Sequence, residues 1–297
     1  MYSTLISVEQ LQALRASGKS YTVFDCSFLL TDPKAGEAMY LEAHIPGAVY
    51  ADLDKHLSAA KDPLSGKPAP GGSASGGRHP LPARENFAAW LASVGFDNTQ
   101  QAVVYDRQGT NYCGRLWWML KWAGHENVAV LDGGLQAWQA AGGAVENGPQ
   151  TQRSTSDYAL APERTVLTAI DAMAKQVGKS AGPGGQTIID ARATPRFRGE
   201  VEPLDPVAGH IPGALNRPFN LNIGADGRFR PAAQLRAEFD SLLAGRAPET
   251  VVHHCGSGVS AIPNIIAMEI AGLGRTALFA GSWSEWCSDP SRPVAQG

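Results

Sequence analysis

The chain has 297 residues, of which 43% are hydrophobic and 18% are charged, and its formal net charge is −3. A disordered chain would hold fewer apolar and more charged side chains, so this chain folds, and it is long enough for two domains. This near-neutral net charge excludes the strongly basic composition of a protein that binds nucleic acid or an anionic membrane through its overall charge.

No uncharged apolar run approaches the roughly 18–20 residues that a membrane-spanning helix needs. Residues 1–18 lack the basic and apolar regions of a secretory signal. The chain has four cysteines, at positions 26, 113, 255 and 287. They form no CxxC pair, no zinc-type spacing and no disulfide framework, so we expect no metal site and a cytoplasmic location.

The first half of the chain is predicted to alternate helices and strands. Ser7 and Gln10 are typical of a capping box, which predicts a helix over 8–15, and a strand follows at 21–25. The next predicted elements are a helix, a strand and a helix, at 84–95, 101–106 and 111–124.

The second half shows the same alternation. Short apolar runs predict strands at 186–191, 251–254 and 276–280, and helical spacing predicts helices at 231–243 and 260–274. Pro231 is expected at the first helical position, and Gly272 or Gly274 is expected to end the second helix. Such alternation predicts an α/β fold, with a mainly parallel sheet and helices on both of its faces.

Four blocks of sequence occur twice in the same order, which indicates a duplicated domain. The paired blocks are 23–26 with 188–191, 42–53 with 208–219, 103–107 with 251–255, and 130–138 with 278–286. We predict an N-terminal domain over 1–141, a polar linker over 142–164 and a C-terminal domain over 165–297.

Two segments rich in Gly and Pro interrupt this pattern. Residues 61–82 form a long segment inside the first domain, and a loop of this length is usually functional or disordered. The sequence GPGG at 182–185 predicts a surface turn.

The two copies differ most informatively at position 255. Here the predicted strand runs into the sequence CGSGVSA and then a helix, whereas the matching residue of the first copy is Arg107. A cysteine at the carboxyl end of a parallel strand lies where such sheets bind ligands. Gly256 and Gly258 permit inward-facing N–H groups, which together with the helix N-terminus favour a thiolate. We therefore expect an active second copy and an inactive first copy.

The loop CGSGVSA resembles the catalytic loop of the 3-mercaptopyruvate sulfurtransferases, which usually reads CGSGVTA and belongs to the tandem-domain rhodanese family. The paired HIPGA blocks, LDGGLQAW, DARATPRFRGE and AGSWSEW resemble that family along nearly the whole chain. The resemblance implies two rhodanese-like domains and a cysteine that takes sulfur as a persulfide. It implies transfer from a small-molecule donor to cyanide or a thiol, no metal or organic cofactor, and no identified protein acceptor.

The resemblance also assigns roles to residues of this chain. Cys255 matches the nucleophile, and Ser257 matches a serine that helps to move a proton during donor cleavage. His79 and Asp54 match the histidine and the acid that work with this serine. Spacing alone leaves Asp52 as an equally good candidate for the acid.

Arg196, in DARATPRFRGE, matches an arginine that binds the carboxylate of the donor. The other predicted substrate-binding residues belong to the cysteine loop: Gly256, Gly258, Val259 and Ser260. A second arginine that is frequent in the family is replaced by Leu204, which leaves Arg192 and Arg198 as substitutes.

Thiosulfate is the alternative donor. Rhodaneses that use thiosulfate usually carry two basic residues after the cysteine, whereas this chain has Gly256 and Ser257, which favours a monoanionic carboxylate donor. Leu204, which stands in place of the second arginine, instead favours thiosulfate or another donor. Rhodanese-like phosphatases carry an arginine six positions after the cysteine, where this chain has Ala261, and a non-catalytic persulfide relay is a further alternative.

Several other residues are expected to have structural roles. They are the thiols Cys26, Cys113 and Cys287 and the histidines of the two HIPGA blocks, His44 and His210.

Overall fold

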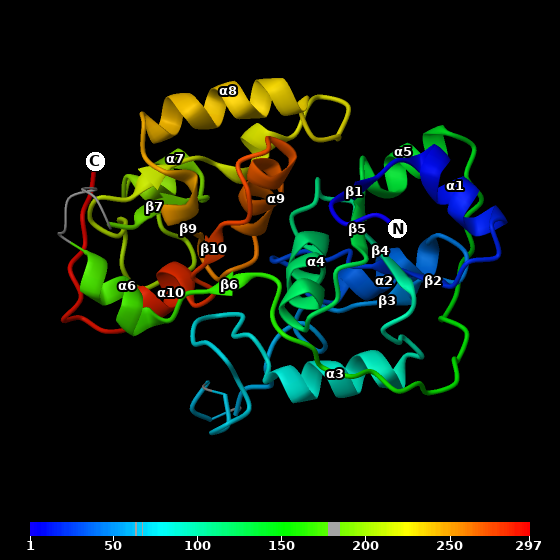
Figure 1. Cartoon of the computed structure of the whole chain (residues 1–297). Coiled ribbons are helices and arrows are strands. Elements are labelled where there is room, and N and C mark those ends of the chain that lie inside the picture. The colour runs from blue at the N-terminus through cyan, green and yellow to red at the C-terminus, as the bar shows by residue number, and fades with distance from the viewer. Residues whose placement is uncertain (63, 67, 178–184) are drawn as a thin grey trace. The chain divides into compact units, whose positions relative to one another are not determined.

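The computed structural model describes residues 1–62, 64–66, 68–177 and 185–297 (Figure 1). The chain forms two compact units. The first unit comprises Met1–Ala74, Pro82–Arg164 and Gly224–Phe229. The second unit comprises Ser75–Leu81, Thr165–Ile223 and Arg230–Gly297. A short segment from each half of the sequence thus belongs to the other unit, and the predicted domain boundaries stay a prediction.

Each unit contains a five-stranded sheet in which every pair of strands is parallel. The first sheet has the order β1-β5-β4-β2-β3, with β1 Leu5–Ile6, β2 Tyr21–Asp25, β3 Val49–Tyr50, β4 Gln101–Tyr105 and β5 Val128–Leu131. The second has the order β6-β10-β9-β7-β8, with β6 Val166–Leu167, β7 Thr187–Asp190, β8 Leu215–Asn216, β9 Val251–His254 and β10 Ala277–Leu278. In chain order the two topologies are identical, which confirms the parallel α/β prediction.

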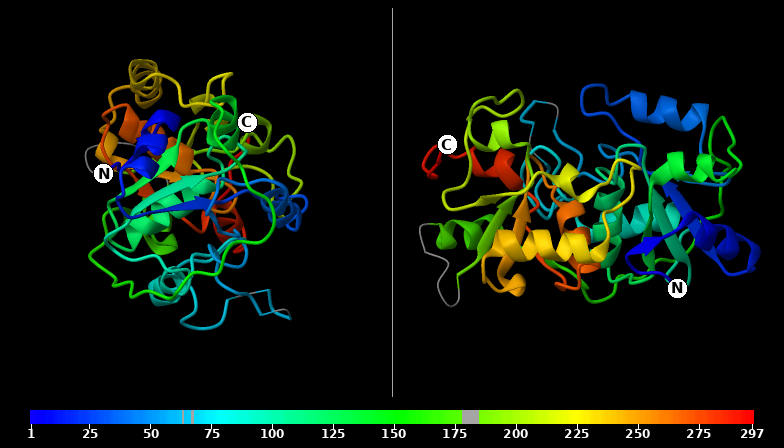
Figure 2. Two further views of the ribbon diagram at one scale, coloured as in Figure 1. Left: turned by 90° about the vertical axis from the view of Figure 1, so that its right-hand side faces the viewer. Right: turned by 90° about the horizontal axis from the view of Figure 1, so that it is seen from above.

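Helices flank both sheets (Figures 1 and 2). In the first unit they are α1 Val8–Ala16, α2 Ala35–Glu42, α3 Arg84–Ser93, α4 Cys113–Trp122 and α5 Gly134–Ala140. In the second they are α6 Ile170–Gln176, α7 Thr194–Phe197, α8 Ala232–Leu243, α9 Ile262–Ile270 and α10 Ser282–Trp286. Every residue of β4 and β9 is buried, as expected for strands of a parallel sheet that is covered on both faces.

The helix-end signals of the sequence are largely confirmed. The Ser7 hydroxyl accepts from the Gln10 amide and the Gln10 side chain accepts from the Ser7 amide, which completes the capping box. Gly272, at φ +69°, follows the end of α9. The prediction for Pro231 is wrong by one position, because its extended backbone (φ −53°, ψ 141°) makes it the N-cap of α8.

The sequence patterns missed several short helices, among them α7 and α10, which contain four and five residues. Residues 142–164, which were predicted as a linker, belong to the first unit. Glu146 pairs with His44 in a backbone bridge, and the Ser156 amide donates to the Ala92 carbonyl. The turn predicted at 182–185 falls largely outside the described residues. Within the described ranges, every helix is too short or too polar to span a bilayer.

Candidate active site

Cys255 stands at the carboxyl end of β9, an inner strand of the second sheet, as predicted. The loop 255–261 connects this strand to α9. The cysteine is 1% exposed. The parallel topology therefore brings the predicted nucleophile to the edge of the sheet where ligands bind in α/β folds.

The cysteine loop is fixed along the start of α10. The Trp283 amide donates to the Cys255 carbonyl at 3.0 Å, and the Ser284 amide donates to the Gly256 carbonyl at 2.9 Å. In the opposite direction, the Cys255 amide donates to the Ser282 hydroxyl at 3.1 Å. Three hydrogen bonds thus hold the backbone of the nucleophile and its neighbour, so the thiol projects from a rigid support.

The two loop glycines are needed for different reasons. Gly258 has φ +75°, and a Cβ at this position would meet the Ala280 carbonyl oxygen at 2.1 Å. Gly256 is not among the residues with positive φ, so the predicted need for an unusual backbone holds only for Gly258. A Cβ at Gly256 would instead lie 3.0 Å from a guanidinium nitrogen of Arg78 and 3.5 Å from one of Arg196.

Ser282 has a left-handed backbone, with φ +56°, although it is not glycine. The matching residue of the first copy is Gly134, with φ +59°. A left-handed non-glycine residue costs about 1–3 kcal/mol. In the second copy this strained residue is the one whose hydroxyl accepts a hydrogen bond from the Cys255 amide. The same hydroxyl donates a hydrogen bond to the Phe279 carbonyl.

Replacing Ser282 separates the strain from the hydrogen bond. Ser282→Gly removes both, so its free energy of unfolding should stay within about 1 kcal/mol of the parent. Ser282→Ala keeps the strain and loses the bond, so it should be about 1–2 kcal/mol less stable. Denaturant unfolding measures both values. Equal stability of the two variants would show that the left-handed backbone of Ser282 costs nothing.

His79 and Ser257 lie together, although they are far apart in the sequence. The His79 Nδ1 and the Ser257 Oγ form a hydrogen bond of 2.7 Å, and both residues are buried. His79 reaches the second unit because the segment Ser75–Leu81 belongs to that unit. The Arg78 amide helps to hold this segment by donating to the Ser284 hydroxyl at 2.9 Å.

Asp54 belongs to the first unit, in the turn after β3. Its amide donates to the Asp52 carboxylate at 2.8 Å, so Asp52 shapes this turn. Asp54 is exposed, and partial desolvation, followed by the charge of Asp52, raises its pKa. Asp52 also accepts from the Lys55 amide. These contacts commit Asp52 to the turn and leave Asp54 as our candidate for the acid.

Arg196 is held by two acidic side chains. Its Nη2 donates to Glu202 at 2.6 Å and to Asp205 at 3.2 Å. Arg78 pairs with the other oxygen of Asp205 through a short ion pair. Together with the distances to Gly256, these contacts place two guanidinium groups beside the residue that follows the nucleophile.

The two arginines considered as substitutes at Leu204 both lie near acidic side chains, and Arg192 shares Glu202 with Arg196. Arg192 pairs with the fully buried Asp190 at 2.7 Å and packs over the Trp283 ring. Arg198 is 55% exposed and lies 3.7 Å from Glu200. Leu204 itself is exposed.

Sequence reasoning did not single out Arg78. The available signal was its position directly before His79, in a Gly-rich segment that was expected to be either functional or disordered. If His79 reaches the cysteine loop, its chain neighbour must come near as well. The candidate site thus contains two guanidinium groups that the loop residues Gly256 and Ser257 do not reveal, with Glu202 and Asp205 as their acidic partners.

The two histidines before Cys255 are fully buried in β9. The His253 Nε2 lies 3.2 Å from the Met268 sulfur, and the His254 Nδ1 lies 3.2 Å from the Cys255 carbonyl oxygen. Burial lowers the pKa of His253 to about 3. Burial also lowers the pKa of His254, although Asp190 opposes this shift.

Acid should destabilise the fold through His253. An unfolded histidine has a pKa of about 6.5, so the contribution of His253 is fully present above about pH 7 and is lost as the pH falls towards 3. By pH 5 the loss is roughly 2 kcal/mol. Denaturant unfolding at about pH 7.5 and pH 5 measures this loss. Between these pH values the free energy of unfolding of His253→Leu should fall by about 2 kcal/mol less than that of the parent. An equal fall in both proteins would contradict a neutral His253.

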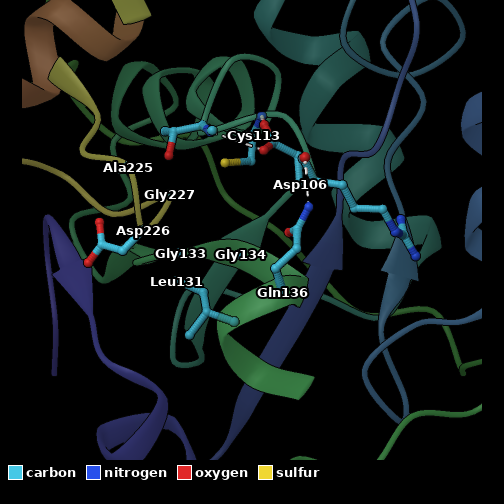
Figure 3. A pocket seen from close by; sticks show the side chains of 12 residues that line it. Asp106, Cys113, Leu131, Gly133, Gly134, Gln136, Ala225, Asp226 and Gly227 are labelled. Carbon is cyan, nitrogen blue, oxygen red and sulfur yellow. Dashed lines mark hydrogen bonds between the residues drawn. The ribbon is translucent and has the colours of Figure 1, made fainter. Parts of the chain in front are cut away.

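In the matching loop of the first unit, a carboxylate of the chain itself accepts the backbone amides. The Asp106 carboxylate accepts four backbone amides at 2.8–3.0 Å, those of Gln108, Thr110, Tyr112 and Cys113. Arg107, at the position of Cys255, turns to Asp25 and to the carbonyls of Met39 and Ala43. A cavity of about 310 Å³ lies beside this loop, with Asp106, Cys113 and Gln136 around it (Figure 3). The inactivity of the first copy stays a prediction.

The residues that were expected to be structural behave as such. Burial raises the pKa of the Cys26 and Cys113 thiols and raises that of Cys287 to about 11. The His44 and His210 Nδ1 atoms each lie 2.8 Å from a carbonyl oxygen, and each ring stacks on an aromatic ring. In the described part of the chain, no group of three or more His, Cys, Asp or Glu could hold a metal ion.

Val259 and Ser260 complete the cysteine loop. Val259 is buried, and its carbonyl accepts from the Ile262 amide at 3.2 Å, which starts the first turn of α9. Ser260 is partly exposed. Pro263 occupies the first turn of this helix, where its missing N–H breaks no hydrogen bond.

Comparison with known proteins agrees with this architecture. The model of the rhodanese-like domain matches residues 7–141 and 173–289. A Pseudomonas aeruginosa protein named "Probable 3-mercaptopyruvate sulfurtransferase" is 46% identical, over 99% of this chain and 98% of its own length. A Mycobacterium tuberculosis protein named "Putative thiosulfate sulfurtransferase SseB" is 40% identical, over 99% of this chain and 97% of its own length.

A solved structure shows the same fold. The 3-mercaptopyruvate sulfurtransferase from Leishmania major superposes with a TM-score of 0.78 at 28% identity, covering 96% of this chain and 74% of that one. Two matched domains, two identical sheet topologies and full-length relatives lead to one conclusion: the chain belongs to the rhodanese-like domain family.

Proposed function

We propose that the chain is a sulfurtransferase, which takes the sulfur of 3-mercaptopyruvate onto Cys255 as a persulfide and passes it to cyanide or a thiol. The observation that carries this proposal is the hydrogen bond of 2.7 Å between His79 and Ser257. Ser257 follows Cys255 by two residues, and Cys255 stands at the end of a parallel strand. A nucleophile with a proton-transferring pair close by is the arrangement that covalent catalysis needs. Relatives with sulfurtransferase names support the reaction class.

The first half-reaction forms the persulfide. The Cys255 thiolate attacks the donor sulfur, the carbon–sulfur bond breaks, and its electron pair leaves on carbon as the enolate of pyruvate. The thiol proton of the donor passes through Ser257 and His79 to the enolate, which yields pyruvate. The outer sulfur then carries the negative charge, and the amides of the cysteine loop stabilise it.

The second half-reaction restores the enzyme. The acceptor attacks the outer sulfur and the sulfur–sulfur bond breaks, so Cys255 leaves as a thiolate and the cycle needs no metal or organic cofactor. Cyanide becomes thiocyanate, and a thiol becomes a persulfide. Gly256, Gly258, Val259 and Ser260 form the loop around the donor, and Arg196 holds its carboxylate. Asp54 stays the predicted acid of the proton transfer.

Thiosulfate is the second candidate donor. The two guanidinium groups beside Gly256 suit a dianion as well as a carboxylate, and the Mycobacterium tuberculosis relative carries a thiosulfate name. The neutral residues after Cys255 and the greater identity to the Pseudomonas aeruginosa protein favour 3-mercaptopyruvate. We place the reaction in the cytoplasm, because all four cysteines are free thiols.

Thiocyanate formation from cyanide tests the proposal with both donors. We expect kcat/KM for 3-mercaptopyruvate to exceed that for thiosulfate by at least about tenfold, a difference of about 1.4 kcal/mol in transition-state binding. A larger value for thiosulfate would reverse the donor assignment. A stable persulfide without turnover on either donor would favour a relay.

A further inference from the structure

We propose that Ser284, in α10, is a positioning residue that keeps His79 within reach of Ser257. Glu285, the next residue of the helix, assists it. The inference rests on the proposed function and adds to it two residues from outside the cysteine loop. Both act through the segment Ser75–Leu81, which carries His79 into the second unit.

The backbone of α10 holds the cysteine loop. The Ser284 amide donates to the Gly256 carbonyl at 2.9 Å, and the Trp283 amide donates to the Cys255 carbonyl at 3.0 Å. Gly256 directly precedes Ser257 in the chain. The backbone of Ser284 therefore fixes the peptide group that leads into Ser257.

The side chain of Ser284 holds the other segment. Its hydroxyl accepts from the Arg78 amide at 2.9 Å and donates to the Gly281 carbonyl at 3.2 Å. A serine hydroxyl has a single donor, and the bond to Gly281 uses it, so the oxygen lone pairs can face the Arg78 amide. Arg78 directly precedes His79. One residue thus fixes the chain neighbours of both members of the proton-transferring pair.

These contacts close a ring of five residues. Peptide bonds join Gly256 to Ser257 and Arg78 to His79. Three hydrogen bonds complete the ring: Ser284 to Gly256 at 2.9 Å, Arg78 to Ser284 at 2.9 Å, and His79 to Ser257 at 2.7 Å. In the proposed reaction only the last of these bonds passes a proton. The other two take no part in the chemistry, so they can hold His79 at Ser257 while the third changes.

Close packing of two glycines leaves the segment little freedom. Gly77 has φ +87°, and a Cβ there would lie 2.4 Å from the Gly281 carbonyl oxygen and 2.9 Å from the Ser284 Oγ. The Gly76 amide donates to the Glu285 carboxylate at 3.2 Å, and a Cβ at Gly76 would lie 2.4 Å from the same oxygen. Glu285 is therefore a second anchor of the segment on α10.

The first copy lacks both anchoring side chains. The residues that match Ser284 and Glu285 are Gln136 and Ala137. The Gln136 side chain donates to the Arg107 carbonyl at 2.9 Å, within its own loop, and alanine has no polar side chain. The packing of this helix beside its loop, which both copies share, does not need the two anchors. They occur in the copy that contains the proposed nucleophile, as a role in its reaction requires.

Ser284→Ala removes the hydroxyl and keeps the amide. We expect kcat for 3-mercaptopyruvate to fall about tenfold, which is near the upper end of what one hydrogen bond contributes. KM should change less than about twofold, because the Arg78 guanidinium is anchored separately at Asp205. With thiosulfate, whose leaving group needs no proton, kcat should change less than about twofold.

Two further variants serve as rescue and control. Ser284→Thr keeps the hydroxyl and should recover most of the lost kcat, whereas a threonine variant as slow as Ser284→Ala would contradict the role of the hydroxyl. Ser288→Ala is the matched control. It also removes a serine hydroxyl beside α10, one that donates to the Glu285 carbonyl at 2.8 Å, and it should change neither kcat nor KM.

The double variant Ser284→Ala/His79→Asn shows whether Ser284 acts through His79. If it does, the double variant should be no slower with 3-mercaptopyruvate than His79→Asn alone. A further loss of about tenfold would show that Ser284 acts by another route, and the proposal would fail. An equal loss with both donors in Ser284→Ala would assign the residue to the support of Cys255 and would overturn the proposal too.

The chemical reactivity of His79 distinguishes this inference from the proposed function. Diethyl pyrocarbonate modifies accessible imidazole groups, and His79 is 6% exposed. Mass spectrometry of the full chain after treatment gives the rate at His79 without any turnover. Ser284→Ala should raise this rate about threefold or more, since a segment opens more readily once an anchor is lost, and Ser288→Ala should not.

A raised rate in Ser284→Ala supports the positioning role even if the parent turns over neither donor, in which case the sulfurtransferase proposal alone fails. Turnover in the parent, together with an unchanged kcat and an unchanged His79 reactivity in Ser284→Ala, refutes the positioning role alone.

Discussion

Cys255→Ser is expected to reduce sulfur transfer to background, a loss of at least about 10³-fold in kcat, because covalent catalysis cannot proceed without its nucleophile. Serine has nearly the same shape, and the Cys255 amide still reaches the Ser282 hydroxyl. The fold and its stability should therefore persist. Steady-state thiocyanate formation and circular dichroism measure the two properties separately.

Cys287→Ser is the matched control, since this thiol is buried in the same unit. Burial raises its pKa to about 11, which keeps it protonated at neutral pH. Its substitution should leave turnover unchanged. Mass spectrometry after treatment with donor should locate an added mass of about 32 Da, one sulfur atom, on Cys255. Activity of Cys255→Ser above trace levels, or the adduct on another cysteine, would assign a different nucleophile.

Much of the fold follows from local patterns in the sequence. The strand before Cys255 was predictable because parallel strands that are covered on both faces form short apolar runs. The duplication was visible because its blocks keep their order. Helices of four or five residues, such as α7 and α10, escape such reasoning, since one helical turn shows no periodicity.

The site was less predictable, because it is assembled from distant segments. The loop around Cys255 is contiguous and could be identified, whereas Arg78 comes from a Gly-rich segment without periodicity and joins the second unit only through tertiary structure. Ser282 shows a second limit. Its sequence gives no sign of a left-handed backbone, and only the matching Gly134 hints at it.

Replacing the proton-transferring pair should separate the two donors. With 3-mercaptopyruvate, a carbanion-like enolate leaves and needs a proton, whereas with thiosulfate the leaving sulfite is a stable anion. His79→Asn keeps a hydrogen-bonding nitrogen near Ser257 but cannot carry a proton near neutral pH. We expect kcat for 3-mercaptopyruvate to fall about 10²- to 10³-fold, while kcat for thiosulfate changes less than about threefold.

Ser257→Ala and the double variant complete this test. Because the Nδ1 of His79 and the Oγ of Ser257 are 2.7 Å apart, the two residues should act as one unit. The double variant should then be no slower with 3-mercaptopyruvate than the slower single variant, since effects within a unit are not additive. Single-turnover persulfide formation isolates the step concerned. If both donors slow equally, His79 shapes the cysteine loop and does not transfer the proton; if the losses multiply, the two residues act independently.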